Sequence, residues 1–303
     1  MATMKDVARV AGVSTATVSV TLSGASFVSP ELQARVKAAI NALGYERNSV
    51  ASGLKRGKTA LIGLVVSDVT NPFFTELVHC VQGEARKAGY SVLLGISDHD
   101  AVREAELLRL MRSHQAEGTI ICPAGRIEDY QPQHLSIGRM KLVAVDNAAP
   151  ELPFDTIALD NRKAASLATN HILSFGHRHI ATMAGLPHQF VSRERLSGYE
   201  AALQGHGLSR NPAFIRHGDF RLENAFRSCS ALLAQPQRPT ALFVANNLML
   251  IGVMQAFAEA QISVPGDMSV ASIDDFPWAP AFQPALTVVR QPIAAMASAA
   301  LEC

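Results

Sequence analysis

Residues 4–22 carry the feature that most constrains the fold: two short runs of helical spacing joined by a glycine. The first run places valine and alanine side chains on one helical face, and Gly12 permits a tight turn after it. Ser14 can then cap a second helix, which turns Val18 and Leu22 inward. This is the helix-turn-helix pattern, although an ordinary helical hairpin within a core has similar spacing.

The second helix of this pattern is predicted to expose a compact and nearly uncharged face. Thr15, Ala16, Ser19 and Val20 fall on that face, which suits the major groove of DNA. Up to Thr59 there are eight Lys and Arg against three Asp and Glu, a balance of +5, and the remaining nineteen against twenty-three give −4. A basic head on a mildly acidic body is typical of a nucleic-acid-binding module with its own sensor.

A third helix completes the predicted headpiece, which spans residues 1–46. Ser29 caps this helix, Pro30 occupies its first position, and Gly44 ends it. The following segment, residues 47–59, is too short to form a stable helix alone, and it contains a glycine that costs about 1 kcal/mol in a helix. We therefore expect a hinge helix or linker that folds when two copies meet on DNA.

From residue 60 the pattern changes to buried strands that alternate with helices. The predicted strands are residues 61–66, 91–96, 118–122, 142–145, 179–184, 213–216, 241–245 and 268–273, and the predicted helices are residues 73–87, 102–114, 162–175, 193–204, 222–233 and 248–260. This alternation indicates parallel sheets covered by helices on both faces. We predict an α/β body, residues 60–303, with two lobes at about 60–160 and 161–291, and ligand-binding residues just after the strands.

Cysteine usage and hydropathy bound the class of protein. The four cysteines, Cys80, Cys122, Cys229 and Cys303, are far apart in the sequence, which favours free thiols in a reducing compartment. The N-terminus lacks a basic and then apolar signal sequence, and no run approaches about 18 apolar residues. We therefore expect a cytoplasmic protein with no membrane partner.

The sequence offers no pattern that demands catalysis. His177 and His179, with His171, form the best metal candidate, but no cysteine or carboxylate pattern completes a site. There is no Gly-x-Ser-x-Gly elbow, dinucleotide fingerprint or acid pair at a defined spacing. We therefore predict no enzyme activity, no metal and no cofactor.

Motifs along the whole chain resemble the lactose/galactose repressor family of bacterial transcription regulators. They are Lys5–Ala8, Ala11–Ser14, Thr17–Ser19, Leu43–Tyr45, Asn71–Phe74, Gly176–Arg178, Glu194–Arg195, Gly198–Tyr199, Ala245–Asn246, Val264–Pro265, Ile273–Asp275 and Leu286–Pro292. The resemblance implies a homodimer in which each headpiece reads half of a near-palindromic operator. It also implies a body with the fold of periplasmic sugar-binding proteins, and a repressor controlled by a small molecule.

The resemblance also implies the DNA-binding residues. These are Lys5, Ser14, Thr15, Ala16, Thr17, Ser19, Val20, Tyr45, Asn48 and Leu54. Val20 departs from the family pattern, which commonly has arginine or another polar residue there, and it offers only apolar contact, for instance to a thymine methyl. We therefore expect an unusual operator half-site. Leu54 matches the leucine that kinks the operator from the minor groove; the alternative is a leucine that packs the hinge onto the headpiece.

In the body, the resemblance assigns effector contacts to three polar residues. Arg195, Asn246 and Asp274 match the family's effector-binding positions, and their guanidinium, amide and carboxylate groups can satisfy sugar hydroxyls. Phe73 and Phe74 stand where aromatic residues often line the cleft. The alternatives are a structural salt bridge for the two charged residues and plain core for the phenylalanines.

Three other functions remain alternatives at this stage. A solute-binding protein without DNA function has similar lobes, a sugar-acting enzyme with a fused headpiece requires a catalytic acid or base, and a truncated regulator would be inactive. The truncated regulator is an alternative because members of the family usually continue for some thirty residues past Cys303. A sugar, a sugar acid and a nucleobase all suit the predicted polar set, and the ligand can act as inducer or corepressor.

Overall fold

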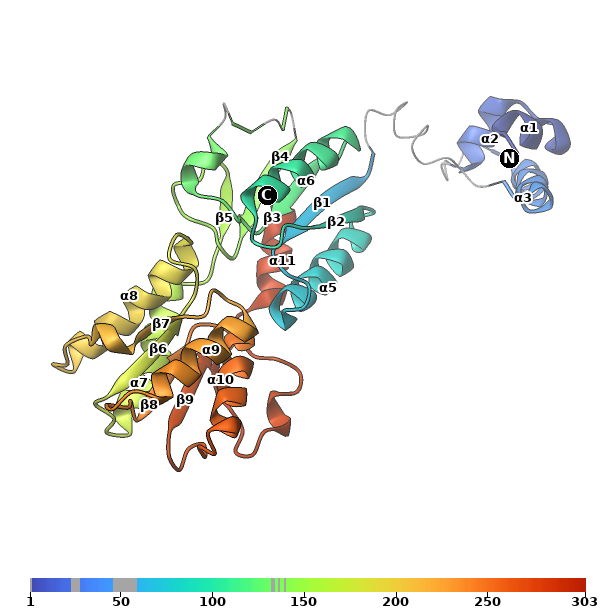
Figure 1. The fold of residues 1–303 in the computed structure, drawn as a ribbon. Helices are drawn as coiled ribbons and strands as arrows, with labels where there is room; N and C mark the ends of the chain where they lie inside the picture. Colours follow the sequence, from blue (N-terminus) through green and yellow to red (C-terminus); the bar gives the residue numbers. More distant parts are fainter. Residues whose placement is uncertain (1, 23–27, 46–58, 132–133, 136, 139) are drawn as a thin grey trace. The chain divides into compact units, whose positions relative to one another are not determined.

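The computed structural model describes residues 2–22, 28–45, 59–131, 134–135, 137–138 and 140–303. The chain forms two compact units, Met1–Thr59 and Ala60–Cys303 (Figure 1). Within the described residues, no helix is both long enough and apolar enough to cross a membrane.

The first unit contains the three expected helices, which are α1 (Met4–Ala11), α2 (Thr15–Leu22) and α3 (Pro30–Leu43). Gly12 and Gly44 end α1 and α3 in the left-handed conformation, with φ of 63° and 55°. The Ser14 hydroxyl accepts the Thr17 backbone N–H at 3.1 Å, and the Ser29 hydroxyl accepts that of Leu32 at 3.4 Å. The predicted caps are therefore confirmed, because each depends only on residues within one turn of the helix end.

One small apolar core holds the three helices together. It is built from Val7, Ala8, Ala11, Val18, Val36 and Ala39, with Leu22 and Tyr45 packed against it. The Arg35 guanidinium donates to the carbonyl of Ala11 at 2.6 Å and to that of Gly12 at 3.3 Å. Arg35 therefore fastens α3 to the turn between α1 and α2.

The second unit contains two five-stranded parallel sheets, one in each lobe. The first has the order β2-β1-β3-β4-β5 and the second β10-β9-β8-β6-β7. The strands of the first lobe are β1 (Leu61–Val66), β2 (Ser91–Ile96), β3 (Gly118–Ile121), β4 (Lys141–Val145) and β5 (Asp155–Ile157). Those of the second lobe are β6 (Ile180–Ala184), β7 (Ile215–His217), β8 (Ala241–Val244), β9 (Ser269–Ile273) and β10 (Thr287–Val289). The predicted parallel α/β class is confirmed.

Helices cover both sheets. They are α5 (Pro72–Lys87), α6 (Ala101–Ser113), α7 (Asn161–Ser174), α8 (Phe190–Gly205), α9 (Leu222–Leu233), α10 (Asn247–Glu259) and α11 (Ile293–Glu302), with short 3-10 helices at Ile127–Tyr130, Pro212–Phe214 and Ala279–Ala281. Helix α11 follows the second sheet in the chain but lies beside α5 in the first lobe (Figure 1), where Ile293, Met296 and Ala297 join its core. The chain therefore crosses between the lobes more than once.

The sequence pattern missed the shortest strands and one helix start. Strands β5 and β10 have three residues each, too few to show a period. The third three-residue strand, β7, was predicted at residues 213–216, but Pro212–Phe214 forms a 3-10 helix and the strand begins at Ile215. Helix α8 begins at Phe190 rather than at the predicted Arg193, and its N-cap, Gln189, makes no side-chain hydrogen bond to the helix. Without a capping side chain, the start of α8 leaves no local signal in the sequence.

The close packing of α7 against α8 depends on Gly198. A Cβ at this position would overlap the carbonyl oxygen of Arg162, which is backbone and cannot swing away. We expect Gly198→Ala to lower the free energy of unfolding by about 2–3 kcal/mol, as overpacked cores do. Urea unfolding followed by circular dichroism measures this effect.

Gly205, at the end of the same helix, is the matched control, because a Cβ there meets no atom within 4 Å. Gly205→Ala is expected to leave stability unchanged or to raise it by about 0.5–1 kcal/mol. Equal effects of the two substitutions would contradict this account of the α7–α8 contact.

Candidate DNA interface and effector site

A small cavity lies between the two lobes, at the carboxyl ends of the strands. We call it the inner cavity; its volume is about 30 Å³. From the first lobe it is lined by Ser67, Asn71, Phe73, Phe74, His99, Asp146 and Asn147, and from the second by Gln189, Val191, Arg195, Phe220, Asn246 and Asp274. The structure thus brings all five predicted effector-binding residues together. A cavity of this size has room for only one or two waters.

Arg195 is the central charged group of the inner cavity, and it is only 2% exposed. Its Nη2 lies 4.0 Å from Asp146 in the first lobe, and its Nη1 lies 3.8 Å from Asp274 in the second. Its Nε donates to the Asn161 side chain at 2.8 Å, and Nη1 also donates to the carbonyl of Ala245. The guanidinium is thus fixed by neutral acceptors of the second lobe, and it faces carboxylates from both lobes.

Asp274 is held by a residue outside the predicted site. Its Oδ1 accepts the Gln291 side-chain amide at 2.5 Å. Gln291 is itself buried, and its own amide oxygen has no hydrogen-bond partner in the described structure. Gln291 therefore orients the carboxylate that faces Arg195.

The other predicted effector residues lie at the starts of two helices. Phe73 and Phe74 lie in the first turn of α5 with their ring centroids 5.0 Å apart at 74°, and Asn71 caps that helix by accepting the Phe73 N–H at 2.9 Å. The carbonyl oxygen of the Asn246 side chain caps α10 by accepting the Met249 N–H at 2.9 Å. Both phenylalanines also belong to the core of the first lobe, so they contribute to the core and to the cavity wall.

Several residues that line the inner cavity were not among the predicted effector-binding residues. Four residues of the lining share an unusual backbone conformation. His99, Asp146, Phe220 and Asp274 all have a left-handed backbone, with φ of 60°, 69°, 59° and 73°. Each follows a strand by one to three residues. Non-glycine residues with positive φ are uncommon and collect at functional sites. The position after a strand was the available signal for these residues, and it is strongest for Asp146 and Asp274, which directly follow β4 and β9.

Hydrogen bonds join the lobes beside the inner cavity. The Asn147 amide nitrogen donates to the carbonyl of Pro123 at 2.7 Å, and its oxygen accepts the backbone N–H of Val191 at 3.1 Å. The Gln189 amide lies 3.3 Å from the His99 ring nitrogen. Asn147 thus ties two loops of the first lobe to the first turn of α8 in the second.

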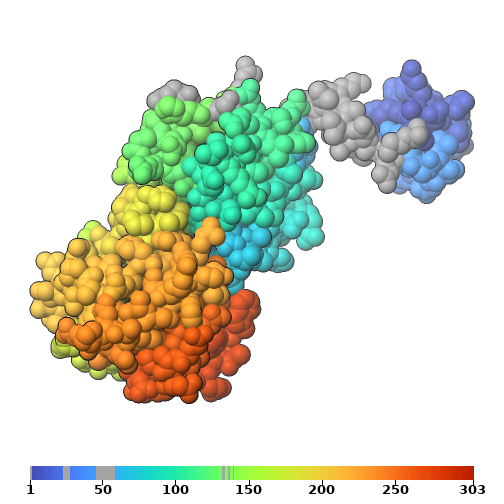
Figure 2. Space-filling view, viewed as in Figure 1, coloured from blue at the N-terminus to red at the C-terminus, as the bar shows by residue number. Residues whose placement is uncertain are grey.

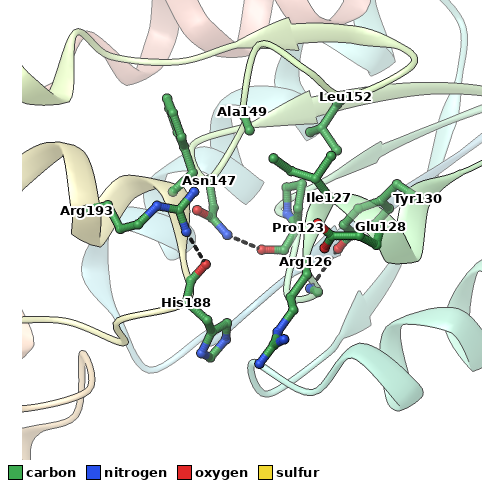
Figure 3. A pocket seen from close by; sticks show the side chains of 12 residues that line it. Pro123, Arg126, Ile127, Glu128, Tyr130, Asn147, Ala149, Leu152, His188 and Arg193 are labelled. Atoms are coloured by element: carbon green, nitrogen blue, oxygen red, sulfur yellow. Dashed lines mark hydrogen bonds between the residues drawn. The ribbon is translucent and has the colours of Figure 1, made fainter.

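A larger cavity opens on the other side of Asn147, between the same two lobes (Figure 3). We call it the outer cavity; its volume is about 310 Å³. It is lined by Pro123, Gly125, Arg126, Ile127, Glu128, Tyr130, Asn147, Ala149 and Leu152 of the first lobe and by His188, Phe190 and Arg193 of the second. In the space-filling view, the green and teal atoms of the first lobe meet the yellow and orange atoms of the second along this boundary (Figure 2).

In the headpiece, the predicted DNA-contacting residues gather at the start of α2. Thr15 and Ala16 are exposed in its first turn, while Ser19 and Val20 are half-buried. Ser14 and Thr17 form the cap of this helix, Lys5 is exposed on α1, and Tyr45 packs on the headpiece core. Asn48 and Leu54 lie outside the described residues.

Burial changes the acidity of the two aspartates of the inner cavity. Burial raises the pKa of Asp146 to about 7; the nearby Arg195 opposes this shift, and Asp274 adds to it. Burial also raises the pKa of Asp274, against the opposing effects of Arg195 and of the Gln291 hydrogen bond. The two carboxylates and the guanidinium therefore form one coupled charge cluster.

Comparisons with known proteins agree with this architecture. The model of bacterial regulatory proteins of the lacI family matches residues 3–48, and that of the periplasmic binding protein-like domain matches residues 169–303. The chain is 34% identical to the HTH-type transcriptional repressor PurR of Photobacterium profundum, over 100% of this chain and 90% of that protein. It is 36% identical to the Ribose operon repressor of Escherichia coli, over 96% of this chain and 88% of that protein.

A solved structure extends the similarity to three dimensions. The Lac repressor dimer bound to operator and the anti-inducer ONPF superposes with a TM-score of 0.90 at 26% identity, over 99% of this chain and 91% of that chain. A helix-turn-helix headpiece joined to a two-lobed binding body defines a ligand-controlled transcription regulator. The chain belongs to the lacI family of bacterial regulatory proteins, and it is a regulator and not an enzyme.

The raised pKa of Asp146 makes stability depend on pH. The native state binds this proton more tightly than the unfolded chain, so the contribution of Asp146 to stability is greatest below the unfolded value of 3.8 and falls as pH rises toward 7. Asn does not titrate, so Asp146→Asn removes this fall in stability with rising pH. We expect the stability of the variant relative to the native protein to rise between pH 4 and 8, by no more than about 4 kcal/mol.

Urea unfolding at a series of pH values measures the difference. Asp155→Asn, at an exposed position on β5, controls for the loss of one negative charge. If the free energies of unfolding of Asp146→Asn and the native protein differed by the same amount at every pH, the raised pKa assigned to Asp146 would be contradicted.

Proposed function

We propose that this protein is a cytoplasmic repressor that binds a near-palindromic operator as a homodimer and is controlled by a sugar-like molecule bound between its lobes. The start of α2 reads bases through Thr15, Ala16 and Val20, and Lys5 contacts phosphate. Arg195, Asn246 and Asp274 bind effector hydroxyls, and Phe73 and Phe74 supply apolar surface.

One observation carries the effector half of this proposal: the Arg195 guanidinium faces carboxylates from both lobes at 3.8 and 4.0 Å. These separations exceed hydrogen-bond distance, so the carboxylates keep lone pairs for ligand hydroxyls. A ligand bound there contacts both lobes and therefore has different affinities for different lobe angles. That difference in affinity is what an effector needs to shift a conformational equilibrium.

The relatives support the DNA half and the ligand class. One relative is named as a ribose operon repressor, and one similar solved structure is a repressor dimer bound to operator. The exposed and nearly uncharged first turn of α2 suits direct contact with base edges. Together these points favour a sugar-responsive regulator over a solute-binding protein without DNA function.

The first test is DNase footprinting of the full chain on its own upstream DNA at a stated salt concentration. We expect protection of a pseudo-palindrome with a hypersensitive centre, because two headpieces bind half-sites and kink the DNA between them. Thr15→Ala is expected to weaken protection at the half-sites. Diffuse coating that salt removes, with no defined site, would contradict the proposal.

The inner cavity is tested with Asp274→Asn, which keeps the shape of the side chain and removes its charge. Ribose and the sugars of the regulated genes serve as probes in an operator-binding assay. We expect the effector concentration for half-maximal response to rise at least about tenfold, because a charged hydrogen bond to ligand is lost. Asp275→Asn is the matched control, since Asp275 does not line the inner cavity. An unchanged effector response in Asp274→Asn would show that the effector does not bind at Asp274.

The hinge is tested with Leu54→Ala, where Leu54→Ile serves as the control that keeps the apolar bulk. If Leu54 enters the minor groove, its truncation removes the wedge that holds the kink open. We expect loss of the hypersensitive centre and of operator bending in gel-mobility assays, with operator affinity reduced at least about tenfold. Bending and affinity equal to those of Leu54→Ile would assign this leucine to packing alone.

A further inference from the structure

The outer cavity differs in chemistry from the inner cavity. Each cavity has one histidine, His99 or His188, but the inner cavity has two aspartates and one arginine, whereas the outer cavity has two arginines, Arg126 and Arg193, and a single acid, Glu128. An anionic group is therefore repelled by the inner pair of carboxylates and attracted to the outer set.

The three basic side chains reach the outer cavity from opposite walls (Figure 3). Arg126 comes from the loop after β3, His188 from the loop before α8, and Arg193 from the first turn of α8. The Arg193 guanidinium donates to the carbonyl of His188, which fixes its position while leaving other N–H groups available. Arginine is the side chain best suited to bidentate binding of phosphate or carboxylate.

The loop that carries Arg126 is held in place by a buried network. Glu104 on α6 is only 2% exposed, and its carboxylate accepts the Tyr130 hydroxyl at 2.5 Å and the Ala124 backbone N–H at 2.9 Å. The Tyr130 oxygen in turn accepts the Gly125 N–H at 2.8 Å. This wall of the outer cavity is therefore preformed rather than assembled by the ligand.

The two cavities share Asn147 as a lining residue and are therefore direct neighbours. We propose that the outer cavity is a binding subsite for an anionic group, phosphate or carboxylate, of the effector whose hydroxyls bind in the inner cavity. The inference rests on the proposed function, because it assigns a chemical class to the same effector: a sugar phosphate or a sugar acid. The volume of about 310 Å³ accommodates such a group with its neighbouring carbons.

The test uses inorganic phosphate and acetate as separate probes on the full chain, each compared with chloride at equal ionic strength. Thermal unfolding of the native protein is expected to shift upward with at least one of the two anions. The apparent affinity is expected to fall at least about tenfold in Arg193→Gln and in Arg126→Gln. The anion that gives the larger shift identifies the class, phosphate ester or carboxylic acid.

Arg178→Gln is the matched control. Arg178 is also exposed and also donates to a neighbouring backbone carbonyl, that of His177, but it lies before β6, at the end of the strand away from the cavities. We expect this variant to keep the full anion response. The subsite does not exist if neither anion raises the unfolding temperature of the native protein. It also does not exist if the anions stabilise Arg193→Gln as much as they stabilise Arg178→Gln.

Hydrogen–deuterium exchange locates the bound anion independently of the variants. Protection of the peptides that cover residues 124–130 and 188–193 is expected, and protection confined to other segments would overturn the proposal. Because neither measurement uses DNA, a failure here is distinct from a failure of operator binding, which would overturn the proposed function instead.

Discussion

The burial of the Arg195 guanidinium is the constraint on which the inner cavity depends. A charge this deeply buried is tolerated only when its N–H groups find acceptors and its charge finds counter-charges. Asn161 and Ala245 satisfy the first need within the second lobe, while Asp146 and Asp274 satisfy the second from both lobes. The ion pairs are long and the neutral hydrogen bonds are short. The guanidinium is thus fixed in one lobe, yet its counter-charges remain free to engage a third group.

The strand ends explain why this cluster forms where it does. Parallel strands place all their carboxyl ends at one edge, so residues that follow different strands converge there. Asp146 follows β4 and Asp274 follows β9, and both adopt a left-handed backbone that aspartate tolerates better than bulky side chains do. The strain of these two residues is offset by the sheets and by bonds such as that of Gln291 to Asp274.

Local signals predicted the headpiece and most of the sheets, because caps, turns and apolar runs act within a few residues. The caps at Ser14 and Ser29 and the boundaries of β1 and α9 follow from such signals. Among the lining residues, Asn147 and His99 follow predicted strands by two and three residues, and Gln189 carries no local signal. Nothing in the sequence shows that the three meet, because crossovers bring their distant loops together. The Gln291 contact with Asp274 likewise spans 17 residues and exists only in the folded second lobe.

The small inner cavity constrains how any effector acts. A space of about 30 Å³ excludes a sugar ring, whereas the neighbouring 310 Å³ does not. A sugar ring can therefore contact the polar residues of the inner cavity only if the lobes separate there. The Asn147–Val191 hydrogen bond, which joins the lobes at that boundary, opposes this separation. The free energy of separating them reduces the affinity of the ligand, and by linkage the ligand favours the separated form to the same extent. For an effector bound at the proposed inner site, the lobe angle is therefore the quantity on which binding acts.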